Sequence, residues 1–136
     1  NISVGDKKIY SVNEGYWEIF HDLDRNYISS IKKEGIYSLR YVGSMVGDVH
    51  RTLLKGGIFL YPSDAKHPNG KLRLLYEAAP LSFLIIQAGG AATSDGINPL
   101  DILPEKHDQR IPIVLGNKVE VDKYLNSTTK TNSDII

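Results

Sequence analysis

The chain has 136 residues, a length that suits a single domain, and its 41% hydrophobic and 24% charged residues are ordinary for a globular protein. Because 16 basic residues balance 16 acidic ones, a nucleic acid or an anionic membrane surface is not expected as the main partner. The absence of cysteine excludes disulfides, thiolate nucleophiles and cysteine-ligated zinc. No stretch approaches the roughly 20 apolar residues of a membrane span and no signal peptide is visible, so we expect a cytoplasmic protein.

Strands and helices alternate in the predicted secondary structure. In chain order, the predicted elements are a strand over residues 7–12, a helical turn over 16–20, helices over 22–33 and 44–55, strands over 57–61 and 72–75, a helix over 80–88, strands over 91–93 and 111–115, and a helix over 118–125. This alternation predicts an α/β fold, a single mixed sheet with helices on both faces in three layers. We expect residues 1–125 to form the domain and residues 126–136, which are polar, to be a disordered tail.

The helices are predicted from apolar spacing and from their ends. Met45, Val49 and Leu53 recur one turn apart and form the stripe of the clearest helix, which Ser44 can cap. The helix over 22–33 is expected to be capped by Asp22 or Asp24 and to bury Ile28 and Ile31, while the helix over 80–88 is expected to bury Leu81, Leu84, Ile85 and Ala88.

Tyrosines stand at several of the predicted element ends, where α/β proteins usually place ligands. These are Tyr16, Tyr41, Tyr61 and Tyr76. On this pattern alone they could be half-buried packing residues or ligand contacts. Arg40 and Tyr41 precede a helix start that could bind a phosphate, but on the local sequence alone a plain helix cap is the better interpretation.

Lys71, Arg73 and Glu77 form the most suggestive charged group. In an extended segment Lys71 and Arg73 share one face, and Glu77 follows where the strand passes to a helix. A carboxylate in this position can bind Mg²⁺, but a surface salt bridge with Arg73 or Lys71 is the simpler interpretation of the spacing. No cluster of acidic residues accompanies Glu77, so most ligands of a metal centre would have to come from elsewhere.

Four longer segments narrow the interpretation. They are residues 10–16 (YSVNEGY), 40–53 (RYVGSMVGDVHRTL), 56–62 (GGIFLYP) and 68–77 (PNGKLRLLYE). In sequence, order and approximate spacing these segments resemble class I fructose-1,6-bisphosphatases, and the resemblance continues through residues 88–90 and 109–112 to cover most of residues 8–125. It identifies the chain as similar to the C-terminal half of the sugar-phosphatase fold, without the N-terminal half that carries the main metal motif.

The resemblance implies a Mg²⁺-dependent hydrolysis of the 1-phosphate of fructose 1,6-bisphosphate to fructose 6-phosphate, with Mn²⁺ or Zn²⁺ as substitutes. The residues it assigns to the 6-phosphate are Asn13, Tyr16, Tyr41 and Tyr61. Lys71 is expected to contact the sugar and its 6-phosphate, and Arg40 to reach the 6-phosphate of a neighbouring subunit. The sugar pocket is expected to be lined by backbone at Gly43, Ser44 and Met45. Glu77 is expected to bind the metal, with Arg73 close by.

The resemblance also implies partners and leaves alternatives open. The expected partners are the enzyme's N-terminal half and further copies of the protein in a tetramer, and this domain alone is expected to be inactive. Sedoheptulose-1,7-bisphosphatase is a related alternative, which the run from Ser11 to Tyr16 and Tyr61 fit less well. A non-catalytic module that binds sugar phosphates is the alternative from another class. Ala78 and Ala79 depart from some family members beside Glu77 but leave the carboxylate in place.

Overall fold

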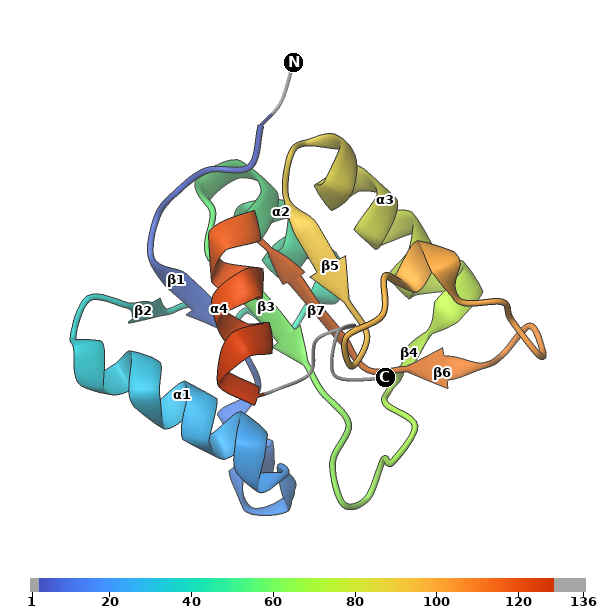
Figure 1. Ribbon diagram of the computed structural model, residues 1–136, viewed down its shortest axis with the longest axis horizontal. Helices are drawn as coiled ribbons and strands as arrows, with labels where there is room; N and C mark the ends of the chain where they lie inside the picture. The colour runs from blue at the N-terminus through green and yellow to red at the C-terminus, as the bar shows by residue number, and fades with distance from the viewer. Residues whose placement is uncertain (1–2, 129–136) are drawn as a thin grey trace.

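The computed structural model describes residues 3–128 and has a five-stranded mixed sheet at its centre (Figure 1). The strand order is β2-β1-β3-β7-β5. These strands are β1 (Ile9–Ser11), β2 (Ser38–Leu39), β3 (Ile58–Tyr61), β5 (Ala91–Thr93) and β7 (Ile113–Gly116). β1 lies parallel to both β2 and β3, whereas β7 is antiparallel to β3 and β5. The mixed α/β sheet expected from the sequence is therefore confirmed.

The path of the chain explains why helices cover both faces of this sheet. Helix α1 (Asp22–Glu34) connects β1 to β2, and helix α2 (Met45–Lys55) connects β2 to β3 on the other side of β1. Parallel neighbours require crossover connections, which are almost always right-handed. Because these two crossovers run in opposite directions across the sheet, one handedness places α1 and α2 on opposite faces. Helix α4 (Lys118–Thr128) joins α1, and helix α3 (Ala79–Gln87) joins α2.

Two hydrophobic cores fill the spaces between the three layers. In β3, Ile58 and Leu60 face the core under α1 and α4, and Phe59 faces the core under α2 and α3. This alternation follows from the two-residue period of a strand, and it confirms that β3 is buried on both faces. Ile28 and Ile31 are fully buried, as the helix pattern predicted.

A second, two-stranded sheet lies beside the first and corrects the expectation of a single sheet. It pairs β4 (Leu72–Arg73) with β6 (Arg110–Ile111) in antiparallel fashion. Pro112 separates β6 from β7, so the one strand predicted over residues 111–115 is two strands in two sheets. Proline cannot donate to a continuing ladder, which favours this break. The strand predicted over residues 72–75 ends at Arg73, where the π-helical segment η2 (Leu74–Ala78) leads into α3.

The helix ends correct several local predictions. Neither Asp22 nor Asp24 caps α1, since His21 holds that position, and Asp24 is buried and accepts a hydrogen bond of 2.6 Å from the hydroxyl of Tyr124. Ser44 occupies the N-cap position of α2 without a side-chain bond. Leu84 was expected inside but is 54% exposed.

The C-terminal end also differs from its prediction. Helix α4 continues to Thr128, so residues 126–128 are helical rather than a disordered tail. Thr128 is fully buried, and its hydroxyl donates a hydrogen bond of 2.8 Å to the carbonyl of Tyr124. The remainder of the predicted tail, residues 129–136, lies outside the described residues. The turn predicted over residues 16–20 is the 3-10 helix η1 (Glu14–Ile19), and a second one, η3 (Pro99–Asp101), was not predicted.

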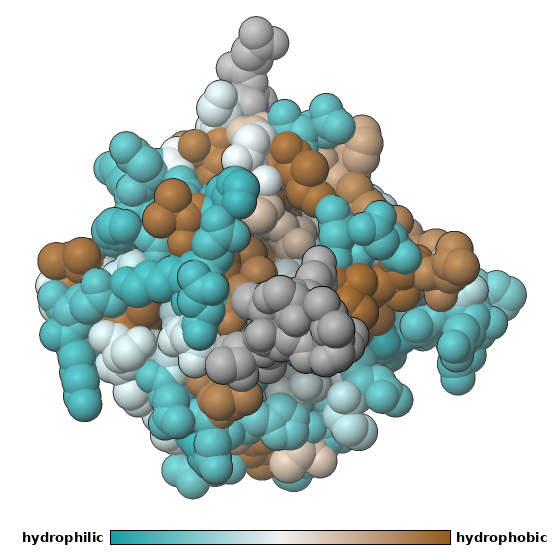
Figure 2. Space-filling view, in the orientation of Figure 1, coloured by the Kyte–Doolittle hydropathy of each residue, from teal (hydrophilic) through white to brown (hydrophobic). Residues whose placement is uncertain are grey.

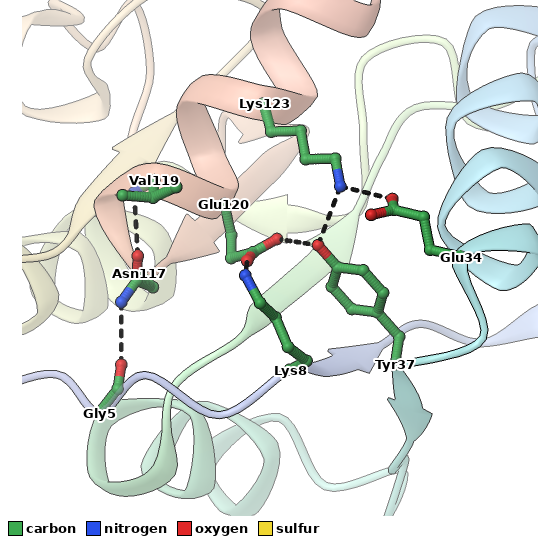
Figure 3. Close-up of polar contacts among 8 residues, drawn as sticks. All are labelled: Gly5, Lys8, Glu34, Tyr37, Asn117, Val119, Glu120 and Lys123. Atoms are coloured by element: carbon green, nitrogen blue, oxygen red, sulfur yellow. Dashed lines mark hydrogen bonds and ion pairs between the residues drawn. The ribbon is translucent and has the colours of Figure 1, made fainter.

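The buried carboxylate of Glu120 in α4 bonds side chains from two other segments of the chain (Figure 3). Glu120 is 3% exposed and lies 2.7 Å from both the ammonium of Lys8 and the hydroxyl of Tyr37. Lys123, one turn further along α4, donates to the same hydroxyl at 3.1 Å and pairs with Glu34 at the end of α1. The network thus joins α4, the segment before β1, and the connection between α1 and β2.

None of the helices in residues 3–128 is long and apolar enough to cross a lipid bilayer.

Candidate functional site

The candidate site lies where the parallel strands end. Since β1, β2 and β3 are parallel, their carboxyl ends meet at one edge of the sheet. After β1 the chain forms β2 on one side of it and then β3 on the other side. This kind of edge is where open α/β sheets bind ligands. Asn13 follows β1, Tyr41 follows β2, and Tyr61 is the last residue of β3. The topology therefore brings three of the predicted site residues to one place.

Lys71 is the charged group of this site. Its ammonium lies 3.9 Å from the ring centre of Tyr16 and 5.1 Å from that of Tyr61, distances typical of cation–π contacts. The side chain is only 9% exposed, and Nζ is 2.9 Å from Oδ2 of Asp64. That separation makes an ion pair, and an ammonium carries three N–H donors. The donors of the ammonium are thus not used up by Asp64.

Gly70 allows the tight turn that comes immediately before Lys71. Gly70 has a φ of +83°, and its amide donates to the carbonyl of His67 at 3.0 Å to close the turn. A Cβ on Gly70 would lie 2.2 Å from the backbone of Ile111 in β6, closer than atoms can approach. Glycine is therefore needed at position 70 for two reasons, a left-handed backbone and a close contact.

Asp48 organises the loop that carries Tyr41. Its carboxylate is fully buried in the first turn of α2 and accepts from the amides of Val42 at 2.9 Å and Gly43 at 3.2 Å. Arg51 completes the arrangement, because its Nη2 donates at 2.9 Å to Asp48 and also to the carbonyl of Arg40. Sequence reasoning missed Asp48 as a site-forming residue. The signal available was an acidic residue three positions before an arginine in the first turn of a helix.

The loop and β3 enclose a small cavity of about 40 Å³. The residues that line it are Tyr41, Gly43, Met45, Asp48, Phe59, Leu60 and Tyr61. Gly43 and Met45, which were predicted to line a sugar pocket, therefore lie beside the two tyrosines. Ser44 sits between them in sequence and has no side-chain capping bond.

The two tyrosine hydroxyls of this cavity remain protonated at neutral pH. Burial raises the pKa of Tyr41, as does the negative charge of Asp48, while a hydrogen bond with Asn13 opposes the change. Burial also raises the pKa of Tyr61, and Tyr41, Tyr16 and Glu77 raise it further. A neutral hydroxyl both donates and accepts hydrogen bonds. The cluster of Asn13, Tyr16, Tyr41, Tyr61 and Lys71 thus presents several donors around one buried positive charge.

Glu77 lies beside this cluster and pairs with Arg73. Oε1 of Glu77 accepts from the Arg73 amide at 3.1 Å and lies 3.3 Å from its Nε, so the salt bridge considered from the spacing is present. The guanidinium of Arg73 also lies 5.1 Å from the ring centre of Tyr76. Within residues 3–128 no group of three or more acidic or histidine side chains could hold a metal ion. Glu77 could therefore supply one oxygen ligand but cannot form a metal centre from this part of the chain alone.

Arg40 lies apart from the tyrosine cluster. It borders a separate cavity of about 500 Å³, with Lys7, Lys8, Ile9, Ile36, Ser38, Arg51 and Lys55. Its guanidinium donates at 2.8 Å to the carbonyl of Leu39, and basic side chains predominate around this cavity. The chain therefore does not bring Arg40 to its own Lys71.

Comparison with known proteins agrees with this fold and arrangement. Residues 4–129 match the family model for the fructose-1-6-bisphosphatase C-terminal domain. The chain is 54% identical over 125 residues to a class 1 fructose-1,6-bisphosphatase of Sulfurihydrogenibium sp. (strain YO3AOP1), covering 90% of this chain and 38% of that protein. It is 49% identical over 130 residues to fructose-1,6-bisphosphatase isozyme 2 of Bos taurus, covering 93% of this chain and 38% of that protein.

The solved structures give the same result. The crystal structure of Leishmania major fructose-1,6-bisphosphatase in the T-state superimposes with a TM-score of 0.91 at 45% identity, covering 96% of this chain and 41% of that chain. The α/β layers thus belong to a sugar-phosphatase domain. The chain is a member of the fructose-1-6-bisphosphatase C-terminal domain family. It spans about two fifths of the length of the relatives that it matches.

Proposed function

We propose that this chain is the sugar-phosphate-binding domain of a fructose-1,6-bisphosphatase, which hydrolyses the 1-phosphate of fructose 1,6-bisphosphate to fructose 6-phosphate in gluconeogenesis. The observation that carries the proposal is the placement of Lys71 between Tyr16 and Tyr61 at the carboxyl edge of the sheet. A buried ammonium with donors to spare, surrounded by neutral hydroxyls, suits a phosphate that must be recognised by several hydrogen bonds.

Each residue of the cluster has a separate task in this proposal. Lys71 supplies the positive charge for the 6-phosphate and a donor to the sugar, and the hydroxyls of Tyr16, Tyr41 and Tyr61 bond the phosphate oxygens with Asn13. Backbone at Gly43, Ser44 and Met45 lines the sugar. Arg40, which borders the separate basic cavity, is assigned to the 6-phosphate bound by a neighbouring subunit.

The proposed metal role of Glu77 is limited to one ligand. Its carboxylate pairs with Arg73, and its negative charge helps to raise the pKa of Tyr61, which supports a role beside the proposed phosphate-binding cluster. Carboxylate oxygen suits Mg²⁺, with Mn²⁺ or Zn²⁺ as substitutes. When bound, such an ion would neutralise charge on the 1-phosphate and activate the attacking water. Arg73 would release Glu77 for this task and remain close to the 1-phosphate.

The N-terminal half of the enzyme is the proposed partner that completes the metal site. Large side chains on η2 and α3 lie open on one side of the domain, and Figure 2 shows hydrophobic residues along α3. They are Leu75, Tyr76, Phe83 and Leu84, which are between 42% and 60% exposed. Apolar residues gathered in this way suit a protein interface. We also propose a tetramer, in which Arg40 serves the neighbouring site.

Titration of this chain with fructose 6-phosphate tests the pocket by itself. We expect the chain to bind it, Lys71→Ala to lower the affinity by about 10-fold to 100-fold, and Tyr61→Phe to lower it less, because a charge-assisted contact contributes about 1.5–3 kcal/mol. Lys118→Ala is the matched control, since this exposed lysine at the start of α4 pairs only with Asp122. Equal affinity of the wild type and Lys71→Ala would contradict the assignment.

Activity measurements separate the proposed enzyme from its alternatives. The chain alone, with Mg²⁺ and fructose 1,6-bisphosphate, should release no phosphate above background, whereas the chain joined to the N-terminal half of a relative should. Preference for sedoheptulose 1,7-bisphosphate in the joined protein would instead support the related enzyme. Binding of fructose 6-phosphate without activity in the joined protein would support a non-catalytic module.

A further inference from the structure

Asp64 is a fully buried carboxylate that touches the phosphate-binding lysine. It lies in the loop between β3 and β4, is 0% exposed, and is 2.9 Å from the ammonium of Lys71. Neither the family resemblance nor the motif analysis gave this residue a role. A buried charge is costly unless it is paired, so a carboxylate kept at this position needs a reason.

The two oxygens of Asp64 have different partners. Oδ1 accepts from the amides of Lys66 at 2.9 Å and His67 at 2.8 Å, and lies 2.9 Å from the imidazole Nδ1 of His67. Oδ2 faces Lys71. The first oxygen therefore fixes the carboxylate to its own turn, and the second is directed at the ammonium.

The turn itself is fastened to the element that carries Tyr16. Asp64 forms an isolated antiparallel bridge with Phe20, and the amide of Ala65 donates to the carbonyl of Ile19 at 2.9 Å. Both partners lie at the end of η1, which contains Tyr16. The Asp64 carboxylate is thus held at a fixed place relative to the tyrosine ring on which the ammonium of Lys71 lies.

Lysine needs such a support more than other phosphate ligands do. Its four-carbon stem has many rotamers, and ordering it costs free energy that a ligand would otherwise have to supply. A carboxylate on one side and two aromatic rings on the other restrict the ammonium before any ligand arrives. Because an ammonium has three N–H donors and Asp64 can occupy only one or two of them, at least one stays available for a phosphate.

We propose that Asp64 is a positioning residue that holds the ammonium of Lys71 in the place where it binds the sugar phosphate. The proposal rests on the proposed function, in which Lys71 binds the 6-phosphate. It assigns to Asp64 no contact with the ligand.

Removing the charge of Asp64 should change the affinity for phosphate, and the direction of that change tells whether Asp64 positions Lys71 or is only a nearby charge. A carboxylate close to a phosphate repels it, so removing the charge of a bystander should strengthen phosphate binding. Removing a positioning residue should weaken binding, because Lys71 loses its ordered place. The two explanations therefore predict opposite changes for the same substitution.

The test is titration of the chain with fructose 6-phosphate in the variant Asp64→Asn, alone and combined with Lys71→Ala. The asparagine oxygen can keep the bonds to the two turn amides, while its NH₂ group replaces the oxygen that faces Lys71, so the charge and the acceptor at Lys71 are both lost. We expect about tenfold weaker binding in the Lys71 background and no further loss when Lys71 is alanine. Lys66→Gln, an exposed change in the same turn, should leave the affinity unchanged.

Two measurements keep the test decisive if Asp64→Asn folds poorly or if no variant binds. Asp64→Ser retains a hydroxyl acceptor for the turn and removes the charge, so it should weaken binding in the same way. Nuclear magnetic resonance of ¹³Cε-labelled lysine should show an ordered Lys71 in the free wild type and a mobile one in both variants. Unchanged or tighter binding, loss that persists without Lys71, or unchanged Lys71 order would overturn the proposal. Absence of binding by the wild type would instead overturn the proposed function, while the order of Lys71 would still decide what Asp64 does.

Discussion

The hydroxyl of Tyr37 lies 2.7 Å from Oε1 of Glu120, a residue 83 positions further along the chain. The bond crosses from the end of the α1–β2 connection to α4, and Lys8 pairs with the other oxygen of the same carboxylate. The packing of three segments of the chain thus depends on the side chain of Glu120, which is almost fully buried.

Replacing Glu120 should therefore destabilise the domain. In Glu120→Ala the hydroxyl of Tyr37 and the ammonium of Lys8 lose their partner, and we expect the free energy of unfolding to fall by about 1–3 kcal/mol. Urea denaturation followed by circular dichroism measures this change. Asp122→Ala, which removes an exposed ion pair on the same helix, should cost less than about 1 kcal/mol. Equal losses in the two variants would contradict a structural role for Glu120.

Asp48 should prove essential for the loop that carries Tyr41. Asp48→Ala leaves two backbone amides and the guanidinium of Arg51 without their acceptor, at a cost of about 3 kcal/mol or more. Binding of fructose 6-phosphate should weaken as well, because the loop position of Tyr41 is no longer fixed. The measurement combines denaturation with ligand titration, and a variant that loses stability but binds normally would show that the loop holds its shape without Asp48.

The stability of the protein should respond to acid through Asp64. Burial raises the pKa of this carboxyl, but its contacts with Lys71 and His67 outweigh burial and lower the pKa from 3.8 to about 2. A carboxyl with a depressed pKa contributes stability that is present above pH 4 and is lost as the pH falls towards 2. The contribution amounts to about 2 kcal/mol.

Comparison of the wild type with Asp64→Asn isolates that contribution. The difference in unfolding free energy between the two proteins should be constant between pH 5 and 7, to within about 0.5 kcal/mol. It should shrink as the pH is lowered from about 4 to about 2, since the wild type then becomes protonated at Asp64. A difference that stays constant over the acid range would show that the carboxyl titrates normally.

Substitution of Gly70 tests the turn that leads to Lys71. Gly70→Ala meets both an unfavourable φ and a backbone contact with Ile111, whereas Gly35→Ala has a similar φ of +72° and open space around its Cβ. Gly35→Ala should cost about 1 kcal/mol, and Gly70→Ala about 1–3 kcal/mol more. Thermal denaturation of the two variants compares the contact with the strain alone. Equal losses would show that β6 moves aside to admit the methyl group.

Local patterns in the sequence predicted most of the helices and strands. The stripe of Met45, Val49 and Leu53 gave the position of α2, because a helix places these residues on one face. The strand expected over residues 111–115 was wrong in one respect, since Pro112 divides it between two sheets. The division depends on pairing with β4, which is 38 positions earlier in the chain and has only 2 residues, and no local pattern records that pairing.

The sequence predicted the residues of the candidate site, but not the residues that hold them in position. Tyr16, Tyr61 and Lys71 could be named from family motifs, and the structure brings them together. Asp48 and Asp64 act through hydrogen bonds to loop amides, which the pattern of hydrophobic and charged residues does not record. The spacing of Asp48 and Arg51 indicates an ion pair, but not the loop that this pair supports. The same reason explains Asp24, which looked like a helix cap and instead bonds Tyr124, 100 residues away.

The central place of β3 has a consequence for how the domain folds during synthesis. This strand pairs with β1 on one side and with β7, which begins at Ile113, on the other. When only the first half of the domain has left the ribosome, one edge of β3 is unpaired. The sheet around the pocket is complete only after β7 has been synthesised. Topologies with such distant pairings fold slowly, and their exposed edges favour aggregation. We therefore expect truncation before β7 to yield an insoluble chain, although every proposed phosphate-binding residue has already been made.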